Sequence, residues 1–380
     1  MRICCLAITG ALALSLPSVV FSQEKGYPRY SSTTEPLQQY TQVNLVSNLS
    51  GVAAVTDPNL VNAWGLSRSS GGDWWISDNT TGLSTLYSGT TGAITPLVVT
   101  IPPADPNASS TGSPTGTIFN GTMDFAVAPG KTALFLFATE DGTISGWNPD
   151  VNPAKAVIVV NEGQKSVFKG LTVAQAAIHG GPLANYLYVA NFRKGQVSVY
   201  NSQFQHNWEA EENFARFQAP EGYAPFNVQN IGGNIYVAFA KQDAAKHDEV
   251  DGAGRGLVAV FRPDGNLIQT LQRGNWFNGP WGLTAAPSDF GAYSHDILVG
   301  NFGSGEIIAF DPVTGKYRGR LRDAKNNPIQ IQGLWGISFG NGTAAGGPAT
   351  SLFFGAGPGQ EANGLFGSLT PIQNNAGNDQ

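Results

Sequence analysis

The densest set of side chains that could do chemistry lies in one stretch, residues 241–256. Four side chains with oxygen or nitrogen ligand atoms fall within five residues: His247, Asp248, Glu249 and Asp251. Carboxylates suit Ca²⁺ and an imidazole suits a transition metal, so we predict a divalent-ion site at His247, Asp248 and Asp251. The stretch lacks the alternating ligands and the distal Glu of an EF-hand loop. A solvated, charged loop is the alternative interpretation.

A repeated three-residue step organises the rest of the chain. An aromatic residue, a Gly and an aliphatic residue recur at Trp64-Gly65-Leu66, Trp281-Gly282-Leu283 and Trp335-Gly336-Ile337, with weaker copies around Asp124, Gly170 and Phe226. The equivalent positions Gly65, Asp124, Gly170, Phe226, Gly282 and Gly336 are 59, 46, 56, 56 and 54 residues apart. A period of about 50 residues built from short strands is typical of a β-propeller, whose four-stranded blades stack on one another. We therefore predict an all-β fold, a six-bladed β-propeller.

Each predicted blade begins with an inner strand at this step. The inner strands are Trp64–Ser67, Met123–Ala128, Gly170–Ala174, Phe226–Asn230, Trp281–Ala286 and Trp335–Phe339. Five blades have segments for four strands, and Phe214–Phe217 is the fourth strand of the third blade. The sixth blade has only three before the chain ends, and the alternating run Gln42–Ser47 fits the missing place. We predict that this N-terminal strand closes the ring, because closure removes free sheet edges.

Propeller topology brings the start of each inner strand and each loop between the second and third strands to one face, around the central channel. Ligand sites are common on such loops. The polar candidates for ligand binding there are Asp78, Asn79, Glu140, Asp141, Asn191, Asp243, Asn301 and Glu361. Each of them could instead cap a turn by accepting a neighbouring N–H. The sequence has neither a Gly-x-Ser-x-Gly elbow nor a phosphate loop, so the catalytic residues are unknown.

The chain begins like the precursor of an exported protein. A basic start, an apolar stretch from Ile3 to Leu16 and small residues ahead of Gln23 indicate a cleaved signal peptide. Cys4 and Cys5 lie within it, so the mature chain would have no cysteine chemistry. We expect this domain organisation: a signal peptide, 1–22; a linker, 23–39; a single β-propeller domain, 40–369; and a polar tail, 370–380.

The composition of the chain argues against some classes of binding partner. The chain carries a net charge of −6 without a basic run, which argues against binding nucleic acid, and no later segment is apolar enough for a membrane span. We expect a secreted monomer, extracellular or periplasmic in a Gram-negative host. Five Asn-x-Ser/Thr sequons mark where glycans could be attached if the host adds them: Asn48, Asn79, Asn107, Asn120 and Asn341.

Several sequence motifs resemble those of one protein family. They are Asp57–Asn62 ahead of Trp64-Gly65, Thr139–Trp147, Tyr223–Gln229, His247-Asp248, and Glu361 ahead of Gly364–Gly367. In this order they are similar to a TIGR family of uncharacterised exported proteins, related to NHL-repeat six-bladed propellers, and the resemblance covers roughly residues 40 to 370. It implies the propeller fold and export. It does not imply an activity, because the family has none assigned.

Three hypotheses about function follow. The first is a secreted propeller that binds a small-molecule or polymeric ligand at its loop face. The second is an extracellular, metal-assisted enzyme resembling a lactonase, hydrolase or lyase, with a divalent ion, Ca²⁺ or a transition metal, held at the channel mouth. The third is a protein-interaction scaffold that uses the sides of the blades. Fold-level analogy carries little weight in choosing among them.

Overall fold

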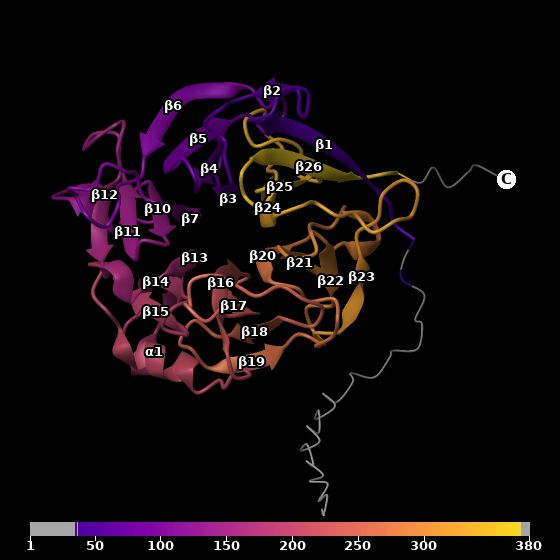
Figure 1. The fold of residues 1–380 in the computed structure, drawn as a ribbon. Coiled ribbons are helices and arrows are strands. Elements are labelled where there is room, and N and C mark those ends of the chain that lie inside the picture. The colour runs from indigo at the N-terminus through magenta and orange to yellow at the C-terminus, as the bar shows by residue number, and fades with distance from the viewer. Residues whose placement is uncertain (1–34, 36, 374–380) are drawn as a thin grey trace, which may run out of the picture. The chain divides into compact units, whose positions relative to one another are not determined.

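Six antiparallel sheets surround a central axis in the computed structural model (Figure 1). The structure describes residues 35 and 37–373, all within the compact unit Thr33–Gln380. The first blade consists of β3 (Ala63–Ser67), β4 (Trp74–Asp78), β5 (Leu83–Tyr87) and β6 (Ile94–Thr100). The second consists of β7 (Pro114–Phe119), β10 (Phe135–Thr139), β11 (Thr143–Trp147) and β12 (Val157–Asn161). The third consists of β13 (Phe168–Ala176), β14 (Ala184–Asn191) and β15 (Gln196–Tyr200).

The remaining blades complete the ring. The fourth consists of β16 (Tyr223–Ile231), β17 (Asn234–Lys241), β18 (Leu257–Phe261) and β19 (Leu267–Thr270). The fifth consists of β20 (Pro280–Ala285), β21 (Ile297–Asn301), β22 (Ile307–Phe310) and β23 (Tyr317–Arg320). The sixth consists of β24 (Leu334–Phe339), β25 (Leu352–Ala356) and β26 (Leu365–Pro371) together with β1 (Tyr40–Ser47). The predicted six-bladed propeller is confirmed.

The N-terminal strand closes the ring as predicted. β1 pairs with β26 in antiparallel register, with Gln42 opposite Leu369, and the short β2 (Val55–Thr56) runs parallel to β1. Tyr40 is buried at the start of β1, and its hydroxyl donates to the carbonyl oxygen of Phe290, 3.1 Å away. The first strand of the described chain therefore occupies the outer position of the last blade.

Close packing of the inner strands explains the Gly of the repeated step. A Cβ added to Gly65 would fall 2.5 Å from the carbonyl oxygen of Thr115 in the second blade. A Cβ added to Gly336 would fall 2.8 Å from the carbonyl oxygen of Trp64 in the first blade. Neighbouring backbones approach so closely that any side chain at these positions would collide with them.

The prediction for the inner strand of the second blade is wrong. Met123 is 91% exposed, and Ala126–Ala128 forms β8, which pairs only with β9 (Lys131–Thr132). The inner strand is β7, in which Gly116 occupies the position of the repeated Gly, 51 residues after Gly65. The prediction located this inner strand by an apolar residue at the repeated step. The ring instead requires a small residue there, because the backbones of two neighbouring blades meet at that position.

The predicted fourth strand of the third blade is also wrong. Its place is taken by the helix α1 (Trp208–Ala215), and the sheet has three strands. Asn207 caps the helix by accepting a hydrogen bond from the amide of Ala210, and acidic residues in the first turn suit the positive end of the helix dipole. Glu211 accepts a 2.9 Å hydrogen bond from the amide of Val199, so the helix covers the edge of β15.

Three short 3₁₀ turns lie in the connections: η1 (Gly163–Lys165), η2 (Ile178–Gly180) and η3 (Gly291–Tyr293). No helix in the described part of the chain is long and apolar enough to cross a bilayer. The predicted signal peptide, most of the linker and the tail after residue 373 lie outside the described residues. Within the predicted linker, the carboxylate of Glu35 pairs with Arg322 at 2.5 Å and accepts a hydrogen bond from Tyr317, so it contacts the fifth blade.

Candidate functional site

Side chains from five blades meet at the mouth of the channel, on the face where the inner strands begin. Asn62 and Lys169 stand at the starts of inner strands, whereas Asn79, Glu140 and Glu361 follow the second strands of their blades. His247 and Asp248 come from the long loop after β17. The predicted meeting of these two kinds of segment on one face is therefore observed, and we call the group the mouth network.

The first half of the mouth network is a chain of amide hydrogen bonds. The indole Nε1 of Trp335 donates to Oδ1 of Asn62 at 2.8 Å, and Nδ2 of Asn62 lies 2.6 Å from Oε2 of Glu361 and 3.2 Å from Oδ1 of Asn79. Asn79 in turn donates from Nδ2 to Oε2 of Glu140, 2.9 Å away. This chain connects the sixth, first and second blades.

Lys169 forms the centre of the second half. Its ammonium lies 2.5 Å from Oε1 of Glu140 and 3.4 Å from Oδ1 of Asp248, and its side chain is 0% exposed. The same ammonium lies 4.9 Å from the ring centroid of Trp64 and 5.8 Å from those of Phe192 and Phe226. Two carboxylates and three aromatic faces therefore enclose one buried cation.

Electrostatics keep this lysine charged. Burial alone would lower the pKa of Lys169, but the carboxylates of Glu140, Glu249 and Asp248 outweigh burial and raise it. An amine that stays protonated cannot act as a nucleophile. The structure therefore assigns Lys169 the role of a fixed positive charge.

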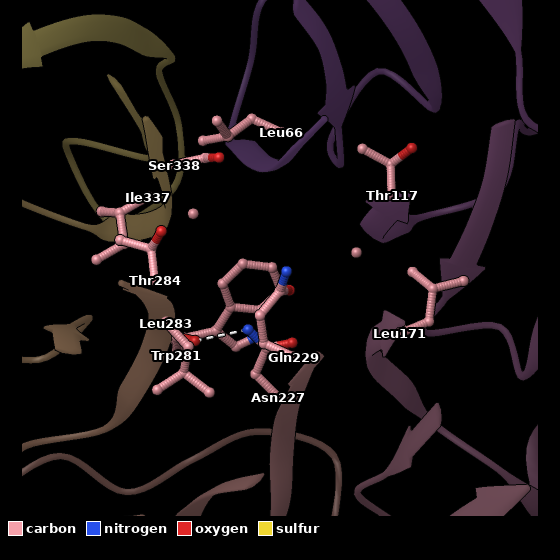
Figure 2. Close-up of a pocket in the computed structure, with 12 residues that line it drawn as sticks. Leu66, Thr117, Leu171, Asn227, Gln229, Trp281, Leu283, Thr284, Ile337 and Ser338 are labelled. Atoms are coloured by element: carbon pink, nitrogen blue, oxygen red, sulfur yellow. Dashed lines mark hydrogen bonds between the residues drawn. The ribbon is translucent and has the colours of Figure 1, made fainter. Parts of the chain in front are cut away.

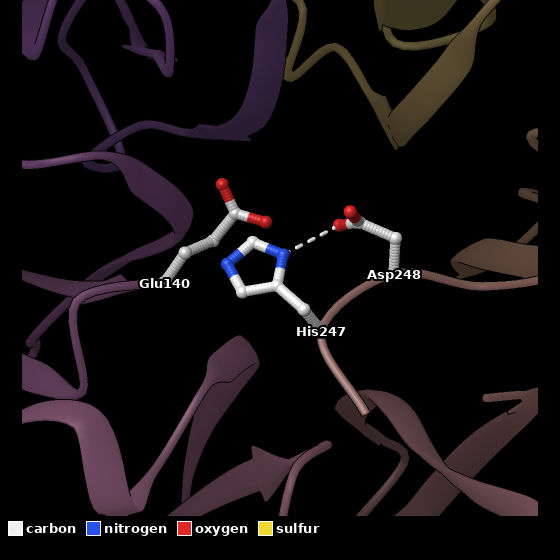
Figure 3. A group of neighbouring side chains, drawn as sticks. All are labelled: Glu140, His247 and Asp248. Atoms are coloured by element: carbon white, nitrogen blue, oxygen red, sulfur yellow. Dashed lines mark hydrogen bonds and ion pairs between the residues drawn. The ribbon is translucent and has the colours of Figure 1, made fainter. Parts of the chain in front are cut away.

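The loop after β17 carries the predicted histidine and aspartate into this group. Nδ1 of His247 lies 2.8 Å from Oδ1 of Asp248, and the hydrogen bond raises the pKa of His247 and lowers that of Asp248 to about 2. Asp243 shapes the loop, because its Oδ1 accepts from the amide of His247 at 2.8 Å. Figure 3 shows the imidazole between the carboxyl groups of Glu140 and Asp248.

The donor set for a metal ion differs from the predicted one. One ligand atom each of Glu140, His247 and Asp248 lies within 4.8 Å of the others. Asp251 is not in this group. A Cβ added to Gly303 would fall 2.3 Å from its Oδ1, so Asp251 lies against the backbone of the fifth blade. The ammonium of Lys169 already pairs with both carboxylates of the trio, so a metal ion would have to compete with it.

Two further carboxyl groups near the mouth are poorly solvated. Burial raises the pKa of Glu249 to about 8, and the negative charges of Asp251 and Glu361 add to this effect. Burial and the charge of Glu140 raise the pKa of Glu361, against the effect of its hydrogen bond with Asn62. A cation or a hydrogen-bond donor placed here would stabilise both carboxylates.

The backbone of the mouth network is strained. Asn62 has φ of 53° and Glu361 has φ of 66°, both in the left-handed region. Asn enters this region more readily than other residues, whereas a Glu there costs about 1–2 kcal/mol. The hydrogen bond between these two side chains therefore joins two strained positions, and such positions cluster at functional sites.

Four of the predicted ligand residues bond within their own blades instead. Oδ2 of Asp78 accepts from Thr85, and Oδ2 of Asp141 accepts from the amide of Ser113. Asn191 donates to Ser166 at 2.9 Å, and Asn301 accepts from the amide of Asn278 at 3.0 Å. A turn cap describes Asp243 and Asn191, which also accepts from the amide of Lys194. Asp78, Asp141 and Asn301 bond to other segments of their own blades, whereas Asn79, Glu140 and Glu361 belong to the mouth network.

The sequons differ in accessibility. The side-chain nitrogens of Asn79 and Asn120, where a glycan would be attached, donate hydrogen bonds inside the fold. Asn48 and Asn341 are partly buried and also donate from this nitrogen, whereas Asn107 is exposed. Of the five, Asn107 has the geometry that best suits a glycan.

Two central residues, Lys169 and Asn62, were not predicted as site residues. Lys169 precedes Gly170, so in the third blade it occupies the position of Trp64, Trp281 and Trp335. A lysine in the place of an aromatic residue of the repeat could have identified this position from the sequence as a candidate site residue. Asn62 lies two residues before Trp64, and nothing in its own type distinguishes it from a turn residue.

Comparisons with known proteins identify relatives but no activity. The chain is 31% identical over 346 residues to "Uncharacterized protein R648" of Acanthamoeba polyphaga mimivirus, covering 87% of this chain and 80% of that protein. It is 30% identical to "Uncharacterized protein L690" of the same virus, covering 87% and 85%. This chain belongs to their family. No protein-family model matches the sequence.

Solved structures support the fold. The soluble aldose sugar dehydrogenase of Escherichia coli, in its apo-form, is similar with a TM-score of 0.53 and 10% identity, over 88% of this chain and 100% of that one. A glucose dehydrogenase is similar with a TM-score of 0.50 and 12% identity, over 86% of this chain and 98% of that one. At these identities the likeness extends to the propeller fold alone.

Proposed function

We propose that this protein is an exported β-propeller that binds a ligand, a small molecule or a polymer, at the mouth network. The carrying observation is the continuous hydrogen-bonded chain from Trp335 through Asn62, Asn79 and Glu140 to Lys169. Apolar contacts between blades are sufficient to hold a propeller together, whereas burying charged groups is costly. A polar network kept at this cost, on strained backbone, is best explained by binding.

The chemistry of the mouth favours a ligand that donates hydrogen bonds or carries positive charge. Glu249 and Glu361 are poorly solvated acceptors: the charge of Lys169 opposes the rise in both pKa values without outweighing burial, and neither carboxylate forms a salt bridge in the described residues. Asp248 is 62% exposed and His247 is 38% exposed, so both are accessible to a ligand. Lys169 is fully buried and would act on the ligand only through Glu140 and Asp248, as a positioning residue.

The metal-assisted enzyme is the second candidate, and the trio of Glu140, His247 and Asp248 favours it. These residues offer a nitrogen and carboxylate oxygens suited to a divalent ion. The pairing of Lys169 with two of the three is the argument against it. The interaction scaffold has no specific observation in its favour.

A thermal-shift screen tests the proposal. The purified protein is melted with a panel of diamines, hydroxylated amines, oligosaccharides and divalent metal ions. A ligand that binds at the mouth raises the melting temperature of the wild type. The variants Glu361→Gln and His247→Ala should abolish this shift. The control variant Glu212→Gln, at an exposed position of α1, should keep it. A shift that survives both mouth substitutions would contradict binding at this site.

Export and membership of the TIGR family rest on the sequence alone, and export has its own test. Expression of the full chain should give a processed protein in the medium or the periplasm. N-terminal sequencing of that product should begin at Gln23. Retention of an intact Met1 in the cytoplasm would contradict export without affecting the ligand proposal.

A further inference from the structure

A cavity of about 280 Å³ lies between the third and fourth blades, and none of its lining residues belongs to the mouth network. It is present because the third blade has no fourth strand. α1 and the loop 216–222 occupy that position, and a helix followed by a loop fills the space less completely than a strand would. The volume is near the lower end of about 300–1,000 Å³ that is usual for small-molecule sites.

Aromatic side chains from two blades form the walls. Phe214 of α1 and Phe217 of the following loop face Phe239 of β17 and Phe261 of β18. The rings of Phe217 and Phe261 are 5.7 Å apart and nearly perpendicular, at 84°. Tyr223 also lines the cavity and is partly exposed like Phe217, whereas Phe214, Phe239 and Phe261 are buried, so the cavity is open to solvent at Phe217 and Tyr223.

Backbone hydrogen bonds hold the loop 216–222, which forms one wall of the cavity. The amide of Phe217 donates to the carbonyl of Phe214, and the amide of Tyr223 donates to that of Pro220 at 3.0 Å. The amide of Gln242 ties Gly222 to the fourth blade at 2.8 Å. Because these hydrogen bonds fix the loop, the cavity is formed without a ligand, which lowers the entropic cost of binding.

The polar groups of the cavity are few and are not positively charged. Gln196, Gln218 and Glu221 line it, and among the described residues that line it there is no lysine or arginine. An anionic ligand would meet only the like charge of Glu221. The lining therefore suits an uncharged molecule that is mainly apolar and can donate one hydrogen bond.

We propose that this aromatic cavity is a second binding site, which takes a planar, uncharged molecule of one or two fused rings bearing a hydroxyl or amino donor. A flat ring can stack on or meet edge-on the partly exposed rings of Phe217 and Tyr223, and such contacts add to the burial of apolar surface. The site shares no lining residue with the mouth network, so it does not depend on the function proposed for the mouth.

Equilibrium dialysis with 2-naphthol tests the proposal. The wild type should bind one equivalent. Ala215→Phe should weaken binding at least tenfold, because Ala215 lines the cavity and is exposed enough to accept a larger side chain. Ala219→Phe fills the same cavity from the loop and gives a second, independent reading. Glu212→Phe, at an exposed position of α1 outside the lining, is the matched control and should bind like the wild type.

Each other outcome overturns the proposal. Circular dichroism melts establish that the variants are folded. No binding of 2-naphthol to the wild type, or equal binding by both filled variants, would remove the cavity as its site. Binding of acetyl-phenylalanine amide without binding of 2-naphthol would replace the small-molecule site with one for an aromatic side chain of a partner protein.

A smaller cavity lies among the inner strands. Its volume is about 60 Å³, and its lining includes Thr117, Gln229, Thr284 and Ser338, with Trp281 at its wall (Figure 2). Nε1 of Trp281 is buried and has no hydrogen-bond partner among the described residues. Ordered water would account for this cavity fully, so it adds no second proposal.

Discussion

The ammonium of Lys169 lies 2.5 Å from the carboxylate of Glu140, and the two residues belong to neighbouring blades. In the first, fifth and sixth blades a tryptophan occupies the position of Lys169, and those three tryptophans pack together at the channel. The third blade therefore replaces an aromatic contact with a buried ion pair. This exchange places a positive charge beneath the mouth and organises the carboxylates around it.

Replacing Lys169 with Met should lower the free energy of unfolding by about 3–5 kcal/mol, because it leaves the carboxylate of Glu140 buried without a cation. The double variant Lys169→Met/Glu140→Gln should recover part of this loss. Urea denaturation measures both. Lys131→Met is the matched control, since its pair with Asp150 is exposed and such pairs contribute about 0–1 kcal/mol. Equal effects at Lys169 and Lys131 would refute the buried-pair account.

Removing Lys169 should also make the mouth responsive to divalent ions. Without the ammonium, Glu140, His247 and Asp248 are free to bind a cation. Free ion at a hundredfold excess over its dissociation constant stabilises a folded protein by about 2.7 kcal/mol. Melting curves with Ca²⁺, Mn²⁺ and Zn²⁺ should therefore shift more for Lys169→Met than for the wild type. A larger shift in the wild type, abolished by Asp248→Ala, would instead support the metal-assisted enzyme.

Glu249 should make the protein less stable as the pH rises. Its pKa in the folded protein is about 8, above the ordinary value of 4.5 for a glutamate, so folding keeps it protonated while the unfolded chain ionises. The unfavourable contribution grows from about pH 4.5 and is complete above about pH 8. Glu249→Gln should therefore raise the melting temperature more at pH 8 than at pH 4.5. The same difference in Glu212→Gln, an exposed control, would show that Glu249 is not its source.

We expect that the backbone conformation of Glu361 lowers the free energy of unfolding and that its carboxylate is needed for binding at the mouth. Because its φ is 66°, Glu361→Gly should be more stable than Glu361→Ala by about 1 kcal/mol, since Gly adopts the left-handed conformation freely. Both variants lose the carboxylate and should lose ligand binding at the mouth. Urea denaturation of the pair isolates the backbone effect. A Gly variant that is less stable than the Ala variant is incompatible with this account.

Removal of residues 23–48 should open the ring. β1 would no longer pair with β26, and the outer edge of the sixth blade would be free to pair with another molecule. We expect aggregation or a sharp fall in the melting temperature, measured by light scattering and calorimetry. A shorter deletion that ends at residue 34 keeps β1 and should melt like the mature chain. If the longer deletion did so too, closure by β1 would not be needed for stability.

The sequence by itself was sufficient to predict the six-bladed ring. The Trp-Gly steps recur because every blade has to bring its inner strand against the next one, and this local requirement is repeated in the chain at a nearly constant spacing. Closure by β1 followed from counting strands in the last blade. Asn79, Glu140, Glu361, His247 and Asp248 could be named because the topology of a propeller gathers strand ends on one face.

Only the tertiary structure decided which of these polar residues act together. Asn79 and Glu140 lie one position beyond the ends of their second strands and contact neighbouring blades, whereas Asn191 and Asn301, the last residues of theirs, bond within their own blades. The difference depends on neighbours from other blades, which are far away in the sequence. The same holds for Glu140, whose partner Lys169 comes from the next blade. The local sequence pattern shows which strand carries a side chain. The partner that determines the charge and orientation of that side chain belongs to another blade and is brought next to it only when the ring closes.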